Sequence, residues 1–547
     1  MIKNIFLKGV VATTALVISS QAVAQTYQQA YDSISDKALH KHVKVLSSDQ
    51  FGGRLPTTDG EKKTLDYLIS HFKQAGWQGA NNGSFLQPVE LSEISASSDM
   101  SLVVTGNEQT QEFAYVDEMV LATSRVSTLE KLENSDIVFV GYGINAPEYD
   151  WNDYADIDVK GKTVLMLVND PGFETQNPDL FTGSAMTYYG RWTYKYEEAS
   201  RQGAAGAIII HETAPASYPW SVVTNGWTGP QYGLFAEDGN KGRVNVEGWV
   251  TKDTTEKLFK QAGLDFSTYK EKAIKGPISK SLGLKANATV KSTIKNSTSN
   301  NFVATLAGSK TPDEHVLLTG HWDHIGTDDS LSGDKIYNGA HDNATGIGGI
   351  IEIAKALGRL DQTPERSVTV VATTAEEQGL LGSKFYAENP LYPLNKTVAV
   401  FNLDSLNILG QTTDFTVRGK GKSQVEDYLE RAVKTQNRVL APGTNPAAGS
   451  YYRSDHFNFA KVGVPAVFAG GGVDPINEEV AAYREKMLPE MRRCYHQLCD
   501  EYNPQWNFAG AIADLQVHFD AIFHLANSTD WPKWSATSEF QRQLHVK

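Results

Sequence analysis

The alternation of strand-like and helix-like segments in the second half of the chain constrains the fold more than any other feature. Apolar runs rich in β-branched residues predict strands at residues 315–320, 367–373, 397–402 and 464–469. Apolar residues at helical spacing predict helices at residues 344–360 and 511–526. Strands that alternate with helices form a largely parallel sheet, because each crossover helix returns the chain to the edge where the strand began. We therefore expect an α/β fold with a doubly wound, mostly parallel sheet flanked by helices.

The first half of the chain has a different pattern. Apolar residues at helical spacing predict helices at residues 30–47 and 59–76. Short β-rich runs, separated by Gly, Pro and Asn, predict strands at residues 136–141, 163–168 and 205–210. A polar stretch at residues 285–301 is interpreted as the linker that returns the chain to the α/β domain. The sequence therefore predicts a β-rich module inserted into that domain.

With 547 residues, the chain is too long for one compact core. The predicted parts are a signal peptide at 1–24, the N-terminal part of the α/β domain at 25–125, the inserted module at 126–296, the main part of the α/β domain at 297–530 and a C-terminal tail at 531–547.

The signal peptide is predicted from a basic start with Lys3 and Lys8, an apolar stretch at residues 9–19, and the small residues Ala22 and Ala24 before the cleavage site. The alternatives are a buried helix or a membrane anchor, but the apolar stretch is too short to span a bilayer. We therefore expect an exported protein, in the periplasm or secreted.

Charge excludes some classes of partner. The formal net charge is −14 at pH 7, and the acidic residues are scattered rather than grouped. An acidic surface disfavours nucleic acid and anionic membranes. Beyond the signal peptide the sequence has no long uncharged run, so we expect no membrane insertion after cleavage. The sequence predicts no oligomeric state.

The only cysteines are Cys494 and Cys499. Two thiols are too few for a thiolate zinc cluster, so any metal must be bound by His, Asp and Glu. In an oxidising compartment the two cysteines can close a small loop as a disulfide, and the alternative is a pair of free thiols.

Histidines and carboxylates follow the predicted strands where each strand ends. His321 follows the first strand, Glu376 and Glu377 follow the next, Asp404 ends another, and Asp342 opens the first helix. Ligands bind at the carboxyl ends of strands in such sheets. Two neighbouring zinc ions need about five ligands, one of them a bridging carboxylate. Taken singly, each residue has an ordinary explanation as a strand-end histidine, a helix N-cap or a solvated loop acid.

Together these motifs, with the loop at residues 49–60 and the segment Cys494-Tyr-His-Gln-Leu-Cys-Asp500, resemble the co-catalytic zinc aminopeptidases, whose relatives include glutamate carboxypeptidase-like enzymes. The resemblance implies the zinc exopeptidase fold and two zinc ions as cofactors. It also implies a set of five metal ligands, namely Asp342 as the bridge, His321 and Asp404 on one ion, and Glu377 and His496 on the other.

The resemblance also implies the catalytic roles. Glu376 is predicted to take a proton from the attacking water and to pass it to the leaving amine. Asp323 resembles the carboxylate that fixes the tautomer of a ligand histidine. Tyr495 resembles an oxyanion donor, and the alternative is a packed aromatic residue.

Two further segments resemble parts of the same family. Arg453, in Tyr452-Arg-Ser-Asp-His456, is predicted to bind substrate, whereas His456 is expected to be structural because the ligand set is already complete. The inserted module at residues 126–296 resembles a protease-associated domain, which shapes the active-site entrance and contributes no ligand.

The predicted function is hydrolysis of peptide substrates, as an aminopeptidase. An aminopeptidase holds an ammonium with carboxylates, and the motifs supply mostly acids, with Arg453 as the main basic candidate and Arg492 and Arg493 close to His496 in sequence. The alternatives are a carboxypeptidase or dipeptidase on the same site, a glutaminyl cyclase with one zinc, and a receptor-like binding protein that has lost catalysis.

Overall fold

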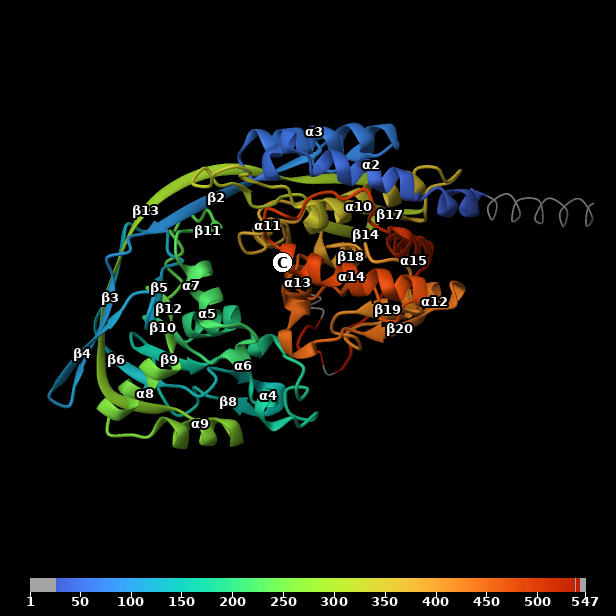
Figure 1. The fold of residues 1–547 in the computed structure, drawn as a ribbon. Coiled ribbons are helices and arrows are strands. Elements are labelled where there is room, and N and C mark those ends of the chain that lie inside the picture. Colours follow the sequence, from blue (N-terminus) through green and yellow to red (C-terminus); the bar gives the residue numbers. More distant parts are fainter. Residues whose placement is uncertain (1–25, 537, 542–547) are drawn as a thin grey trace, which may run out of the picture. The chain divides into compact units, whose positions relative to one another are not determined.

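The structure is a computed structural model that describes residues 26–536 and 538–541, so the predicted signal peptide lies outside the described residues. The chain forms two compact units. The first comprises residues up to Val89, Ser299–Gly443 and the chain from Ser454, and the second comprises Glu90–Thr298 and Thr444–Arg453. Figure 1 labels the helices and strands of both units.

A mostly parallel sheet forms the centre of the first unit. Its strands are β14 (Thr311–His321), β17 (Arg366–Thr373), β18 (Thr397–Asn402), β21 (Ala466–Phe468) and the end of β13 (Lys280–Leu306). β14 pairs in parallel with both β17 and β18, and β18 pairs in parallel with β21. Residues 302–306 of β13 pair antiparallel with β17. The predicted α/β fold with a mostly parallel sheet is therefore confirmed.

Helices cover both faces of this sheet. The helices of the first unit include α2 (Asp36–Leu46), α3 (Asp59–Gln74), α10 (Thr345–Leu357), α11 (Leu381–Glu388), α12 (Val425–Thr435), α13 (His456–Lys461), α14 (Glu478–Cys494) and α15 (Ala509–Ala526). Side chains alternate along β14, so Val316 and Leu318 join the core beneath α10 and α15, whereas Leu317 joins a second core with Phe459 of α13. Among the described residues, no helix is long and apolar enough to cross a membrane.

The second unit has its own sheet and core. Its strands include β2 (Leu86–Ala96), β3 (Ser101–Gly106), β4 (Gln109–Ala114), β5 (Met119–Ala122), β6 (Leu129–Phe139), β9 (Thr163–Leu167), β10 (Gly206–His211), β11 (Pro230–Leu234) and β12 (Val246–Thr251). Strands β6, β9, β10 and β12 run parallel, and β5 closes the sheet antiparallel to β12. α5 (Trp192–Arg201) packs on β10, and α8 (Lys252–Gln261) packs on β12. Residues 90–125 thus supply strands to this unit.

The predicted linker at residues 285–301 is wrong, because these residues lie within the 27-residue strand β13. Buried and exposed side chains alternate through much of its length, with Ala286, Ala288 and Val290 buried and polar residues between them. Such period-two alternation is typical of a half-buried strand, whose polar half resembles a linker in composition.

Candidate active site

Neighbouring parallel strands bring the predicted site residues to one edge of the first unit. His321 is the last residue of β14, and Glu376 and Glu377 follow β17, while Asp404 follows β18. Because β14 pairs with both β17 and β18 in parallel, the three carboxyl ends meet at the same edge. Asp342 lies in the turn before α10 and completes this side of the cluster.

Asp342 stands at the centre of the cluster, with its two oxygens directed to different histidines. Its Oδ1 lies 3.2 Å from His321 Nε2, and its Oδ2 lies 3.1 Å from His496 Nε2. Each histidine also faces a second carboxylate: Asp404 Oδ1 is 3.5 Å from His321 Nε2, and Glu377 Oε2 is 3.0 Å from His496 Nε2. The structure therefore brings the five predicted metal ligands together as two groups that share one carboxylate.

These donors fit metal ions. The ligand atoms of His321, Asp342 and Glu377 lie within 4.8 Å of one another, and so do those of His321, Glu376 and Asp404. Asp342 Oδ1 is buried and accepts no hydrogen bond from any described residue. A buried carboxylate oxygen without a donor is costly unless a cation or a proton satisfies it. Imidazole nitrogens and carboxylate oxygens are the donors that zinc takes where thiolates are absent.

In several of these side chains, a neighbouring polar group contacts the nitrogen or oxygen atom that does not face the cluster. The Ser454 hydroxyl donates to Asp404 Oδ2 at 2.7 Å, and His324 Nδ1 lies 2.6 Å from Glu377 Oε1. His321 Nδ1 lies 3.2 Å from the carbonyl oxygen of Asp323. In each case the partnered atom is turned away from the shared cluster, which fixes the remaining atom toward it.

Asp323 is placed differently from its predicted role. Its carboxylate Oδ1 is 3.9 Å from His321 Nδ1, farther than its own carbonyl oxygen. The same carboxylate accepts backbone hydrogen bonds from Glu376 N at 3.1 Å and Glu377 N at 3.4 Å. The side chain of Asp323 therefore holds the turn that carries both glutamates, while its main chain orients the imidazole.

Burial and close charges shift the protonation of these groups. Burial, together with Glu377 and Asp404, raises the pKa of Glu376 well above its ordinary value despite the opposing charge of His321. Burial also opposes ionisation of Glu377, but contacts from His324 and His496 outweigh it and lower the pKa of Glu377 to about 2. The pKa values of the two adjacent glutamates are thus shifted in opposite directions. Glu377 is held as the anion, and Glu376 favours the protonated form.

A disulfide-closed loop carries His496. Cys494 and Cys499 are bonded to each other, and the loop between them follows the end of α14. Asp500 then accepts from the backbone nitrogens of His341 at 2.9 Å and Asp342 at 3.1 Å. The loop is therefore tied to the turn that carries the central carboxylate.

The predicted oxyanion donor lies on the same loop. The Tyr495 ring stacks on the His496 imidazole, with the ring centres 3.8 Å apart, and 57% of the residue is exposed. This position leaves its phenol accessible beside the cluster.

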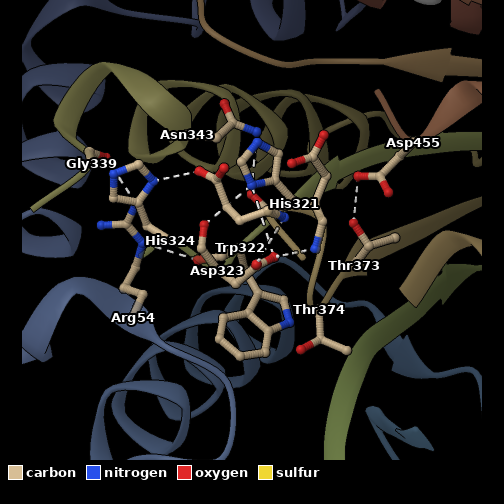
Figure 2. A network of polar contacts seen from close by, with 12 residues as sticks. Arg54, His321, Trp322, Asp323, His324, Gly339, Asn343, Thr373, Thr374 and Asp455 are labelled. Carbon is tan, nitrogen blue, oxygen red and sulfur yellow. Dashed lines mark hydrogen bonds and ion pairs between the residues drawn. The ribbon is translucent and has the colours of Figure 1, made fainter. Parts of the chain in front are cut away.

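Arg54 anchors the turns beneath the cluster, as Figure 2 shows. Its guanidinium is buried and donates to the carbonyl oxygens of Trp322 at 3.0 Å, Asn338 at 2.6 Å and Gly339 at 2.8 Å. Trp322 follows His321 in the sequence, and Gly339 precedes the turn of Asp342. Arg54 therefore links these two segments.

Sequence reasoning missed Arg54, His324, Ser454 and Asp500 as contributors to this site. His324 lies in the motif that identified His321, and Asp500 ends the motif that identified His496. Those two motifs therefore carry a sequence signal for both residues. The contacts of Arg54 and Ser454 join segments far apart in the sequence and leave no local signal.

The remaining predicted residues lie on either side of a unit boundary. His456 is fully buried at the start of α13 in the first unit, where its ring packs near Phe468, 5.3 Å between centres. Arg453 ends the Thr444–Arg453 segment of the second unit and is exposed. Its substrate contact stays a prediction.

A doubly wound sheet with histidines and carboxylates at the carboxyl ends of its strands gives the first unit the donors of a zinc site. Residues 301–520, which carry all five clustered donors, match Peptidase family M28. Over this segment the chain is similar to that family. An aminopeptidase from Aneurinibacillus sp. has a similar fold over 92% of this chain and 97% of its own, with a TM-score of 0.51 and 19% identity.

Two curated relatives are similar over shorter segments. A probable zinc metalloprotease of Pyrenophora tritici-repentis is 29% identical over 152 residues, which are 27% of this chain and 31% of that protein. Aminopeptidase Y of Saccharomyces cerevisiae is 28% identical over 222 residues, which are 39% of this chain and 36% of that protein. The chain thus spans about a third of the length of these relatives.

Proposed function

We propose that this protein is an exported aminopeptidase that hydrolyses peptides with two zinc ions. The observation that carries the proposal is the position of Asp342, whose two oxygens face His321 and His496, each accompanied by a second carboxylate. A carboxylate with this arrangement is suited to bridge two cations. The family match over residues 301–520 supports the same class of enzyme.

In this proposal His321 and Asp404 hold one ion, Glu377 and His496 hold the other, and Asp342 bridges them. When bound, the two ions supply the positive charge that activates water and polarises the scissile carbonyl. Glu376 lies with the donors of His321 and Asp404, so its carboxylate is placed to take a proton from water and to return it to the leaving amine. Tyr495 is proposed to donate a hydrogen bond to the developing oxyanion.

The direction of cleavage is proposed from the charge around the cluster. The edge that carries Asp342, Glu376, Glu377 and Asp404 is rich in carboxylates, which suits an α-ammonium group of the substrate. The yeast relative is named an aminopeptidase.

Export and the role of the second unit belong to the same proposal. A signal peptide at residues 1–24 and a Cys494–Cys499 disulfide are both typical of an oxidising compartment. The second unit, with its parallel β-rich core, is proposed to be a protease-associated domain.

Chelation tests the metal requirement. We expect a chelator to abolish hydrolysis of amino-acid arylamides and added zinc to restore it, with about two zinc ions per chain by elemental analysis. Acetylation of the substrate amine should suppress turnover. Full activity in a verified metal-free sample would refute the mechanism, whereas equal cleavage of acetylated substrates would refute only the direction. One zinc ion per chain with cyclisation of amino-terminal glutamine would favour the cyclase alternative.

A further inference from the structure

The short loop that carries His496 is closed by a covalent bond. Cys494 ends α14, and its disulfide to Cys499 encloses residues 495–498. Cys494 is buried, whereas Cys499 is exposed. Exposed disulfides are the ones that external thiols reach and exchange with. The bond that closes the loop is therefore accessible to a reductant in the folded protein.

His496 adopts a backbone conformation that its surroundings must impose. Its φ of 56° lies in the left-handed region, which residues with a side chain rarely adopt because Cβ crowds the following carbonyl oxygen. Within the loop, Gln497 N donates to Cys494 O at 2.9 Å, and Asp500 N donates to Gln497 O at 3.0 Å. These hydrogen bonds and the disulfide together oppose relaxation of His496. Of these constraints, the disulfide is the one that reduction removes.

The loop is fixed at both ends. On one side Cys494 belongs to α14, and on the other Asp500 accepts from the backbone nitrogens of His341 at 2.9 Å and Asp342 at 3.1 Å. Because Cys499 directly precedes Asp500, the disulfide joins these two fixed ends. Opening the bond frees the residues between the ends and removes no contact of the Asp342 turn.

The loop supplies one histidine of the metal-ligand cluster. His496 Nε2 lies 3.1 Å from Asp342 Oδ2 and 3.0 Å from Glu377 Oε2. The other histidine, His321, is buried at the end of β14, so its position does not depend on the loop. The disulfide therefore acts on one half of the cluster, the pair formed by Glu377 and His496.

We propose that the Cys494–Cys499 disulfide is a redox switch for the metal site. This inference rests on the proposed function, because it takes His496 as a zinc ligand. A dithiol reduces the switch: it gives two electrons and two protons to the S–S bond, the chain gains two thiols, and the dithiol becomes a disulfide. His496 then leaves the left-handed conformation, and Glu377 and His496 bind their ion more weakly. The switch makes a complete metal site dependent on an oxidising compartment.

Zinc competition with a chelator on the full chain tests the switch. The oxidised chain is compared with the chain reduced by a phosphine, which is then removed under argon, since dithiols bind zinc themselves. We expect reduction to weaken the binding of one zinc ion by about 10–100-fold, the range for groups that orient a metal ligand, and reoxidation to restore it. Unchanged, tighter or equally weakened binding of both ions would overturn the proposal. An oxidised chain that binds no zinc would contradict the proposed function as well.

Substitutions separate the bond from the thiols that reduction creates. A chain with both Cys494→Ser and Cys499→Ser should show the affinity of the reduced chain, and a reductant should not change it. Gln497→Ser, at an exposed position of the same loop, is the matched control. It should bind zinc as the unmodified oxidised chain does and lose affinity on reduction. A double-serine chain that keeps the affinity of the oxidised chain would overturn the proposal, even if reduction weakens binding in the unmodified chain.

Discussion

The carboxylate–histidine cluster of the first unit and the buried Arg191 of the second unit carry opposite charges. In the first, Asp342, Glu377 and Asp404 gather around two histidines, and Asp342 Oδ1 remains without a donor among the described residues. In the second, Arg191 is buried, and its Nε has no hydrogen-bond acceptor among the described residues. Elsewhere in the first unit, Arg438 forms a buried ion pair with Asp514 at 2.7 Å. The excess of carboxylates in the first unit's cluster therefore marks a place where a cation is expected.

The largest expected effect separates the two adjacent glutamates of the first cluster. Glu376→Gln removes the proposed proton carrier but no proposed ligand, so kcat should fall by about 10²–10⁴-fold while the zinc content stays unchanged. Glu377→Ala removes a proposed ligand and should lower the zinc content instead. Steady-state kinetics with metal analysis of both variants measures the difference. Equal loss of metal in the two variants would show that their roles are misassigned.

A stability comparison tests whether the buried charge of Arg191 lacks compensation. Arg438→Met leaves Asp514 buried without its partner, which should cost about 3–5 kcal/mol of unfolding free energy. Arg191→Met removes a buried guanidinium whose Nε has no acceptor among the described residues, so the same substitution there should be neutral or stabilising. Urea unfolding of both variants, in buffer free of carboxylates, gives the two values. A similar loss in both would mean that Arg191 is already paired, and the comparison would fail.

The sequence predicted the donors of the first cluster because each lies in a motif at the end of a predicted strand. His321, Glu377 and Asp404 follow β14, β17 and β18, and parallel pairing alone brings such ends together. The surroundings of Arg191 could not be predicted in this way. The segments 186–191 and 444–453 are far apart in the chain, and only their packing in the fold joins them.

The strand β13 shows the same limit for predicting the fold from local sequence. The polarity of residues 285–301 predicts a linker, but the pairing partners that make β13 a strand, β2, β3 and β6, lie about 150 residues or more earlier in the chain. The amino-acid composition of such a strand reflects its exposed polar residues more strongly than its buried residues.

The smallest effect expected concerns His324, which contacts a proposed ligand without being one. Its Nδ1 lies 2.6 Å from Glu377 Oε1 and leaves Oε2 directed to His496. A Cβ added at Gly339 would lie 2.5 Å from the His324 ring, so the ring is held in place by close packing. We therefore expect His324→Ala to weaken zinc binding by about 10–100-fold, since a residue that orients a ligand contributes that much.

His324→Asn distinguishes orientation from packing, because the asparagine amide can still donate near the position of Nδ1. It should recover most of the zinc affinity lost in His324→Ala, although both variants leave space around the ring position. Competition with a chelator measures the affinity, and the absorption spectrum of the cobalt-substituted protein reports the ligand geometry. His315→Asn is the control, at a buried histidine in β14 that stacks on Tyr392, and it should change stability but not zinc affinity. If His324→Asn loses as much affinity as His324→Ala, the side chain supports the site by its volume and not by the hydrogen bond to Glu377.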